Sequence, residues 1–367
     1  MEPDLRKIFG RFRTEGTFLE GNSFGPGHIH DTFRILTAEK ECDDYILQRL
    51  NSNVFTDIPR LQENMERVTT HLRDKISARD GGDVKRECLT LVPDRESGKS
   101  FITDEEGRYW RMFIFIRDHT SYERVDTHHK AFEGGRITGR FQAMLADLPG
   151  PPLHETIPDF HNIAWRLENL HQVLATDPAG RAESVSYETD EILRREEEMK
   201  IILRLVTKGL IPLRITHNDT KFNNILFDRQ TDRALLIIDL DTVMPGYVHY
   251  DFGDAIRTAA NRAEEDSEDL SLVSMDTEIF RAYAEGFLSE AGDTLNATEI
   301  EYLPFAPKLL TYIMATRFLT DYIDGDNYYK IKHPLHNLQR TRAQLTLLRD
   351  MEAQHNTMTQ IIKAITK

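Results

Sequence analysis

The chain changes its pattern of hydrophobic and polar positions about a third of the way along. In the first part, hydrophobic residues alternate with polar ones in short runs, which is the spacing of β-strands. One stretch differs, because Leu61, Met65, Val68 and Leu72 recur at the spacing of an amphipathic helix. Strands are predicted in three segments, at residues 16–38 around a glycine-rich turn, at residues 43–50, and in a hairpin at residues 100–116.

Beyond about residue 118, apolar residues recur mainly at helical spacing, for example throughout residues 190–206. One interruption lies at residues 212–241, where two apolar, strand-like runs flank a polar turn. A chain of 367 residues is long enough for two packed parts. The pattern therefore predicts an α+β fold with a small β-rich N-terminal lobe, residues 1–117, and a large, mostly helical C-terminal lobe, residues 118–367.

The charge balance narrows the choice of partners. Lysine and arginine total 46 against 61 aspartate and glutamate, a formal net charge of −15, which does not suit nucleic acid or anionic membranes. The first residues lack the apolar core of a signal peptide, and no apolar run reaches the roughly 18 residues of a membrane span. Cys42 and Cys88 are the only cysteines, too few for a disulfide framework. We expect a cytoplasmic protein with no obligate protein partner.

The interruption at residues 212–241 carries the candidate chemistry. His217 and Asp219 follow a short apolar run, and Asn224 comes five residues after Asp219. Phosphoryl transfer from ATP needs a carboxylate that orients the acceptor hydroxyl and accepts its proton, and an oxygen ligand for magnesium. The spacing equals the kinase catalytic-loop pattern H-x-D-x-x-x-x-N. The alternative interpretation is a polar loop stabilised by Asn and Asp turns.

A second acidic group lies at the end of the next strand-like run. Asp239 and Asp241 follow this run, and carboxylates at the end of a buried strand are unfavourable unless a cation pairs with them. Asp239 lies twenty residues after Asp219, one hairpin away, so that both carboxylates can face one Mg²⁺ site. The alternative is an acidic pair that only caps the next turn.

Three segments, THNDTKFNN, IIDLDTVMPG and YDFGDAIR, resemble the motifs of the aminoglycoside phosphotransferase and choline kinase superfamily. Together with GPGHIHDTF near the N-terminus, they resemble within it the branch of N-acetylhexosamine 1-kinases. The resemblance covers nearly the whole chain. It implies a bilobal, protein-kinase-like fold and phosphorylation of the anomeric hydroxyl of N-acetylglucosamine or N-acetylgalactosamine with ATP and magnesium.

The resemblance also implies roles for single residues. Asp219 is expected to be the base that positions the acceptor hydroxyl, His217 to orient the loop backbone, and Asp241 to reach the metal through a water molecule. The expected site comprises the catalytic residues Asp219 and Lys221; the magnesium ligands Asn224, Asp239 and Asp241; the nucleotide-binding residues Gly25, Gly27, Gln48, Phe115 and Arg117; and the sugar-binding residues His28, Asp31, Arg317 and Tyr328.

Some positions depart from the kinase pattern. His30 stands where a third glycine is expected, and Pro26 removes one backbone N–H from the phosphate-binding turn. Gln48 stands where kinases carry a lysine on the third strand. We expect Arg49 or Lys221 to supply the missing charge.

The letters Asp-Phe-Gly at residues 251–253 mark the metal loop of protein kinases. Asp251, however, comes thirty-two residues after Asp219 and beyond Asp239, which already occupies the place of the metal ligand. We expect Asp251 to cap backbone N–H groups or to brace the catalytic loop.

The sequence thus predicts an ATP- and Mg²⁺-dependent N-acetylhexosamine kinase, and two alternatives stay open. One is a kinase for another small alcohol, such as an aminoglycoside, choline or homoserine, with which the acidic net charge is compatible. The other is a nucleotide-binding module without turnover, suggested by Gln48 and opposed by the intact Asp219, Asn224 and Asp239. A protein kinase is less favoured, because the chain has no activation segment ending in Ala-Pro-Glu.

Overall fold

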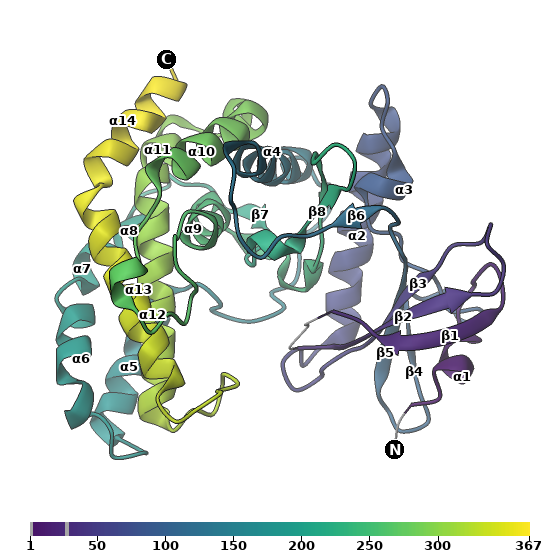
Figure 1. Cartoon of the computed structure of the whole chain (residues 1–367), viewed down its shortest axis with the longest axis horizontal. Helices are drawn as coiled ribbons and strands as arrows, with labels where there is room; N and C mark the ends of the chain where they lie inside the picture. The colour runs from purple at the N-terminus through teal and green to yellow at the C-terminus, as the bar shows by residue number, and fades with distance from the viewer. Residues whose placement is uncertain (1–2, 26–28) are drawn as a thin grey trace.

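The structure, a computed structural model, describes residues 3–25 and 29–367 and consists of a β-rich part and a helical part (Figure 1). The β-rich part holds an antiparallel sheet with the strand order β1-β2-β3-β5-β4. Its hairpin turn between β4 and β5 ends at Gly107, whose φ of +78° favours glycine. The strands are β1 (Phe18–Ser23), β2 (Asp31–Thr37), β3 (Tyr45–Arg49), β4 (Phe101–Thr103) and β5 (Tyr109–Ile114).

The two faces of this sheet have different surroundings. One face packs against helix α1 (Leu5–Phe9) through an apolar cluster that includes Leu47 and Trp110. Side chains alternate across a strand, so Gln48 and Arg111 lie on the opposite face. Gln48 of β3 is directly paired with Arg111 of β5. A polar pair therefore occupies the centre of the sheet face that turns away from α1.

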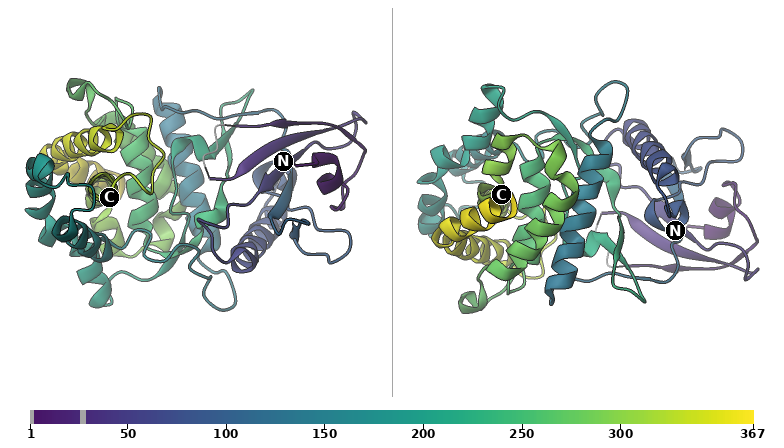
Figure 2. Two further views of the ribbon diagram at one scale, coloured as in Figure 1. Left: turned by 90° about the horizontal axis from the view of Figure 1, so that it is seen from below. Right: turned by 90° about the horizontal axis from the view of Figure 1, so that it is seen from above.

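Helix α2 (Ile58–Ala78) lies between the sheet and the helical part, and the short α3 (Val84–Glu87) follows it (Figure 1). Asp57 caps the N-terminus of α2 by accepting a hydrogen bond from the Arg60 N–H. Of the apolar side predicted from the sequence, Met65, Val68 and Leu72 are buried in the same cluster as residues of α4 and α10, and Leu61 lies in a separate small cluster. Helix α2 thus joins the two parts, which lie side by side along the long axis of the molecule (Figure 2).

The helical part is built on long helices whose apolar residues form two clusters. None of the helices within residues 3–25 and 29–367 is long and apolar enough to cross a membrane. The helices are α4 (His128–Leu145), α5 (Ile163–Thr176), α6 (Ser186–Leu193), α7 (Glu196–Met199), α8 (Ile201–Thr207), α9 (Val248–Ala259), α10 (Thr277–Ala291), α11 (Ala297–Glu301), α12 (Ala306–Asp324), α13 (His336–Ala353) and α14 (His355–Ile365).

Glycines allow α4 and α10 to approach each other closely. A Cβ atom at Gly135 would lie 2.0 Å from the carbonyl oxygen of Tyr283, and one at Gly286 would lie 2.0 Å from that of Phe132. Glycine inside a helix makes the helix less stable than alanine does by roughly 0.5–1 kcal/mol. At these positions the close packing of the two helices offsets that cost. The packing fixes α4, which carries a residue that reaches the catalytic loop.

Two small sheets lie where the β-rich part meets the helices. In one, β7 (Arg214–Thr216) pairs with β10 (Met244–Gly246). In the other, β8 (Ile225–Asp228) pairs with β9 (Ala234–Ile237) and with β6 (His119–Thr120), which comes directly after the connection from the β-rich part. The loops that follow β7 and β9 carry the candidate catalytic residues.

The structure confirms the predicted fold class, with a β-rich N-terminal region followed by a mostly helical one. The boundary near Arg117 stays a prediction. Residues 190–206, read as one helical run, form parts of three helices, because the chain turns at Arg195 and Lys200. Helix α9 begins at Val248, so that Asp251 lies in its first turn.

Candidate active site

The catalytic loop between β7 and β8 is fixed by His217, whose side chain is fully buried. Its Nε2 lies 2.9 Å from the carbonyl oxygen of Ile238, and the Asp219 backbone N–H points to its Nδ1 at 3.3 Å. A histidine that carries its proton on Nε2 satisfies both contacts. His217 thus ties the loop to the end of β9, in agreement with the predicted structural role.

Asp251 braces the same loop from helix α9. Its two carboxylate oxygens accept hydrogen bonds from the backbone N–H groups of His217 at 2.8 Å and Asn218 at 2.7 Å. Gln142 of α4 donates a further hydrogen bond, and the Thr220 hydroxyl donates to the Asp251 carbonyl at 2.7 Å. The Asp-Phe-Gly letters therefore mark a buried support of the loop, as predicted.

Asp219, Lys221 and Asn224 lie together on this loop. The Lys221 ammonium is 3.0 Å from one Asp219 oxygen, and the Asn224 amide donates to the Asp219 carbonyl at 2.9 Å. Desolvation acts to raise the pKa of Asp219, but the ammonium of Lys221 outweighs it and holds this pKa below its ordinary value. Asp219 is therefore ionised at neutral pH, which is the state that accepts a proton from a hydroxyl group.

The backbone holds Asp239 near Asn224, because the N–H of the preceding residue, Ile238, donates to the Asn224 carbonyl at 2.8 Å. Its backbone is left-handed, with a φ of +64°. Desolvation, and then the carboxylates of Asp241 and Asp219, raise the pKa of Asp239 to about 8. Within the described part of the chain Asp239 forms no ion pair, so its carboxyl group is available to a metal ion, which would favour the ionised form.

These oxygens fit magnesium. Mg²⁺ takes few ligands from the protein and completes its shell with phosphates and water. The amide group of Asn224 donates to Asp219, and its side-chain oxygen accepts no hydrogen bond from the residues that the structure describes. Asp239 offers a carboxyl group near it. No group of three or more His, Cys, Asp or Glu residues within residues 3–25 and 29–367 is arranged to hold a metal alone. The donor set suits a cation that arrives with a nucleotide.

Asp241 is engaged differently from Asp239. Its two oxygens accept hydrogen bonds from the Arg111 guanidinium at 2.5 and 2.6 Å, and the Nε2 of His30 lies 3.4 Å away. Burial acts to raise the pKa of Asp241, but Arg111 outweighs it and lowers this pKa. The carboxylate is directed toward the β-rich part, and its contact with a metal stays a prediction.

Arg111 is the residue that sequence reasoning missed. Its side chain is buried, and its Nε donates to the Gln48 side-chain oxygen at 2.9 Å. The two residues expected to replace the third-strand lysine have other partners, since Arg49 binds Asp31 at 2.7 Å and Lys221 binds Asp219. The sequence shows that Arg111 is unusual, because it is an arginine inside the aromatic run at residues 109–116. Its pairing with Gln48 depends on the register of two strands, which the sequence does not show.

In kinases a helix glutamate pairs with the third-strand lysine, but the glutamates of α2 do not pair with Arg111. Glu63 lies 2.9 Å from His154, and Glu66 accepts a hydrogen bond from the Ser100 backbone N–H at 3.2 Å. Helix α2 instead presents the sulfur of Met65 to Arg111 at 3.6 Å.

A cavity of about 660 Å³ opens at the connection between the two parts. Phe115 and Arg117 line it, as do Phe24 and Arg34 from the sheet. The Arg34 guanidinium lies 4.1 Å from the centre of the Phe115 ring. Two of the residues expected to bind nucleotide thus line one cavity, together with the aromatic side chain of Phe24.

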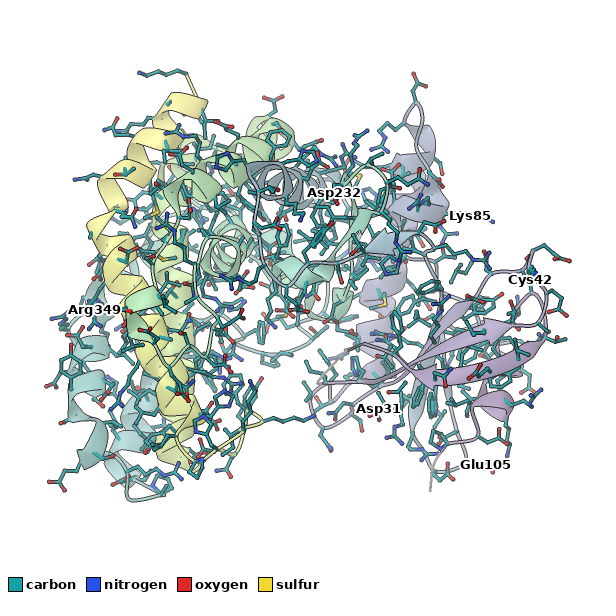
Figure 3. The ribbon with its side chains drawn as sticks, in the orientation of Figure 1. Asp31, Cys42, Lys85, Glu105, Asp232 and Arg349 are labelled. Atoms are coloured by element: carbon teal, nitrogen blue, oxygen red, sulfur yellow. The ribbon has the colours of Figure 1, made fainter. Side chains whose placement is uncertain are left out.

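The turn over this end of the sheet is only partly described. Gly25 has a φ of +77°, which favours glycine, and no atom lies within 4 Å of the place of a Cβ there. Gly27 and His28 lie outside the described residues. Asp31 starts β2 and lies on the side of the β-rich part that faces the helical part, whereas Cys42 and Glu105 lie away from it (Figure 3).

Arg317 and Tyr328 come together at the end of α12. An amino group of Arg317 lies 3.5 Å from the Tyr328 hydroxyl, and the guanidinium also lies 4.9 Å from the centre of the Phe160 ring. Asp321 holds the following loop by accepting hydrogen bonds from the backbone N–H groups of Tyr328 at 2.7 Å and Tyr329 at 3.0 Å. The structure brings the two expected sugar-binding residues together.

His161 connects this group to the catalytic loop. Its Nε2 lies 2.9 Å from the carbonyl oxygen of Asn218, next to Asp219. The neighbouring Arg166 donates to the Phe160 carbonyl at 2.8 Å. Sequence reasoning missed these residues, because single aromatic and basic residues on a helical stretch carry no local signal of a site.

Known proteins resemble this chain in sequence pattern and in fold. A model of the phosphotransferase enzyme family matches residues 20–287, which is more than half of the chain. A microcompartment-associated aminopropanol kinase superposes with a TM-score of 0.66 at 16% identity, covering 97% of this chain and 98% of its own. An aminoglycoside phosphotransferase from Alicyclobacillus acidocaldarius gives 0.62 at 11% identity, covering 99% and 97%.

A third structure shows the same fold with ligands bound. Spectinomycin phosphotransferase, in complex with ADP and spectinomycin, superposes with a TM-score of 0.55 at 13% identity, covering 98% of this chain and 97% of its own. At these identities the superpositions establish the fold, and the family model establishes the relationship. The chain belongs to the phosphotransferase enzyme family.

Proposed function

We propose that the protein is an ATP- and Mg²⁺-dependent kinase that phosphorylates the C1 hydroxyl of N-acetylhexosamines. The observation that carries the phosphotransfer is the joint placement of Asp219, Asn224 and Asp239. A base and two oxygen ligands for metal lie close together, as transfer of a γ-phosphoryl group requires. A nucleotide-binding module without turnover has no need of an ionised, solvent-accessible Asp219.

Asp219 would orient the sugar hydroxyl in line with the γ-phosphate and accept its proton. Lys221, at 3.0 Å from Asp219, would keep the carboxylate ionised and lie beside the transferring phosphate. Asn224 and Asp239 would hold Mg²⁺, which neutralises the charge of the phosphates when it is bound. Most of the acceleration would come from positioning and from charge neutralisation.

The adenine would lie in the cavity of about 660 Å³ beside Phe115 and Arg117. Gly25, Gly27 and Gln48 would line the path of the phosphates, with Gln48 held in place by Arg111. Spectinomycin phosphotransferase binds ADP, and it shares this fold.

The surroundings of Arg317 favour a neutral acceptor. Burial, and then the neighbouring Arg317, lower the pKa of Arg166 to about 10, so two guanidinium groups lie near each other. Neither forms an ion pair with a carboxylate within residues 3–25 and 29–367. An amine or quaternary ammonium acceptor would meet repulsion there. An arginine and the Tyr328 hydroxyl suit a polyol that carries an amide.

The alternative acceptors are amino alcohols and aminoglycosides, which the relatives' names suggest. Release of ADP measured with ATP, Mg²⁺ and each candidate acceptor separates the two classes. We expect turnover with N-acetylglucosamine or N-acetylgalactosamine and none above background with aminopropanol, choline or an aminoglycoside. The opposite pattern would show that the acceptor assignment is wrong while leaving the phosphotransferase assignment intact.

A further inference from the structure

We propose that Arg111, His30 and Asp241 form a clasp between the two parts of the molecule, and that this clasp positions the metal ligand Asp239. The inference rests on the proposed function, because it assigns Mg²⁺ to Asp239. In kinases a third-strand lysine pairs with a helix glutamate and so links the nucleotide to the N-terminal lobe. The clasp would be the arrangement that this chain uses in place of that pair.

Arg111 makes the main contact of the clasp. It lies on β5 of the β-rich part, and it donates two parallel hydrogen bonds to Asp241, which follows β9 of the helical part, at 2.5 and 2.6 Å. Both side chains are 2% exposed, so neither charge has water as an alternative partner. A bidentate pair of this kind fixes orientation as well as distance.

His30 makes the second contact from the glycine-rich turn. Its Nδ1 accepts a hydrogen bond from the Asn51 backbone N–H at 3.0 Å, which orients the ring and leaves the proton on Nε2. This Nε2 lies 3.4 Å from the Asp241 oxygen that Arg111 also contacts, and it has no hydrogen-bond partner among residues 3–25 and 29–367. The turn and the sheet therefore hold the same carboxylate.

The clasp explains two of the departures from the kinase pattern, Gln48 and His30. The side-chain oxygen of Gln48 accepts a hydrogen bond from Arg111 at 2.9 Å, and a lysine there would place a second cation against the guanidinium. A glycine at position 30 would remove both histidine contacts. His30 and Gln48 are thus the residue types that Arg111 and Asp241 require.

The clasp acts on Asp239 through two residues of backbone. Asp239 is held on one side by the bond between the Ile238 N–H and the Asn224 carbonyl. On the other side, the chain is held by Asp241 in the clasp and by Asn64 of α2, which donates to the Val243 carbonyl at 3.2 Å. Arg111 is therefore a positioning residue, which sets the distance of Asp239 from Asn224 without touching the metal.

Calorimetric titration of ADP at a series of Mg²⁺ concentrations tests the clasp, because it needs no acceptor and is unaffected by a wrong sugar assignment. Arg111→Gln and Asp241→Asn are each expected to raise the Mg²⁺ concentration for half-maximal ADP binding by about 10–100-fold, the usual effect of removing a residue that orients a metal ligand. The double variant is expected to be no worse than the poorer single variant, since both remove one interaction. Arg111→Lys, which keeps the charge, should recover part of the loss.

Arg195→Gln is the matched control. Arg195 is also buried and bidentate, with Glu352 at 2.6 and 2.8 Å, but it lies within the helical part. Its loss should lower the melting temperature and leave the Mg²⁺ dependence of ADP binding within about twofold of the wild type.

Three results would overturn the clasp. One is a wild-type Mg²⁺ dependence in Arg111→Gln, or in Arg111→Lys if the first variant does not fold. Another is a double variant whose effect is the product of the two single effects. The third is a loss in Asp241→Asn with a gain in Arg111→Gln, which would mean that Asp241, once freed, binds the metal itself.

Discussion

At the scale of single residues, the proposed phosphoryl transfer depends most on Asp219. Asp219→Asn keeps the size of the side chain and removes the proton acceptor, so we expect turnover to fall about 10²–10⁴-fold. Nucleotide affinity should stay near the wild-type value, because the proposed role of Asp219 is toward the acceptor hydroxyl and not toward the metal or the nucleotide. Single-turnover kinetics and ADP titration of the same preparation measure the two effects. A variant with near-normal turnover would remove Asp219 from the mechanism.

Asp239 gives a prediction about stability and function together. Desolvation and the carboxylates of Asp241 and Asp219 raise its pKa, so without metal its charge is unfavourable. We expect Asp239→Asn to raise the melting temperature of the metal-free protein and to abolish the further rise that Mg²⁺ with ADP produces in the wild type. Thermal unfolding with and without Mg²⁺ and ADP measures both. A lower melting temperature without metal would contradict the predicted repulsion.

His161 gives a pH dependence. Burial, which outweighs its bond to the Asn218 carbonyl, lowers the pKa of His161 in the folded protein to about 3. The unfolded chain titrates near 6.5 and so binds this proton first, which means that the free energy of unfolding falls as the pH drops from about 6.5 toward 3. Each such histidine contributes a slope of about 1.4 kcal/mol per pH unit in that window.

We expect His161→Gln, measured by urea unfolding between pH 4 and 7, to show a shallower slope than the wild type (about one proton less). His249, whose pKa burial lowers to about 4, is unchanged in this variant and keeps its own share of the slope. Equal slopes in variant and wild type would show that His161 is protonated in the folded protein.

At the scale of elements, the contact between α4 and α10 offers a test of packing. A Cβ at Gly286 would meet the Phe132 carbonyl at 2.0 Å and the Arg136 backbone nitrogen at 2.8 Å. Alanine favours a helix, yet we expect Gly286→Ala to lower the free energy of unfolding by about 1–3 kcal/mol, because the backbones must move apart. Gly292→Ala is the control, since no atom lies within 4 Å of a Cβ there and the change should stay within about 0.5 kcal/mol. Equal effects of the two substitutions would contradict the packing argument.

The helices and strands also show which parts of the secondary structure could be predicted from the sequence. Strands at residues 16–38, 43–50 and 100–116 and the helix with Met65 were predictable, because their apolar residues follow one period throughout. Strand β10 was not, because Met244–Gly246 is three residues long and contains a proline. The pairing of Gln48 with Arg111 was hidden for another reason: register is a property of two strands, and one strand does not specify it.

In the site too, contacts within one segment could be predicted and contacts between distant segments could not. Asp219, Asn224 and Asp239 could be predicted because they lie within one hairpin and their spacing alone brings them together. Arg111 and Asp241 are 130 residues apart and meet only through the packing of the two parts. For Asp251 only part could be predicted. Its position after the metal ligand follows from the sequence, whereas its contact with Gln142 depends on how α4 packs in the folded protein.

At the scale of the whole molecule, phosphotransfer requires two parts that meet at a fixed distance. The connections between them include the chain at residues 115–119, helix α2, and the pair of Arg111 with Asp241. The first two are covalent or apolar and hold the parts together, whereas the third fixes charged groups next to the metal ligand Asp239. Substrate specificity then lies in the helical part, around Arg317 and Tyr328.

The acceptor that we propose for this phosphotransferase is the C1 hydroxyl of an N-acetylhexosamine. ³¹P and ¹H nuclear magnetic resonance of the product formed from ATP, Mg²⁺ and an equimolar mixture of N-acetylglucosamine, N-acetylgalactosamine and aminopropanol tests it most directly. We predict one class of product, in which the phosphorus couples to the anomeric proton of the sugar. A phosphate on C6 of the sugar, or on the hydroxyl of aminopropanol, would contradict the account.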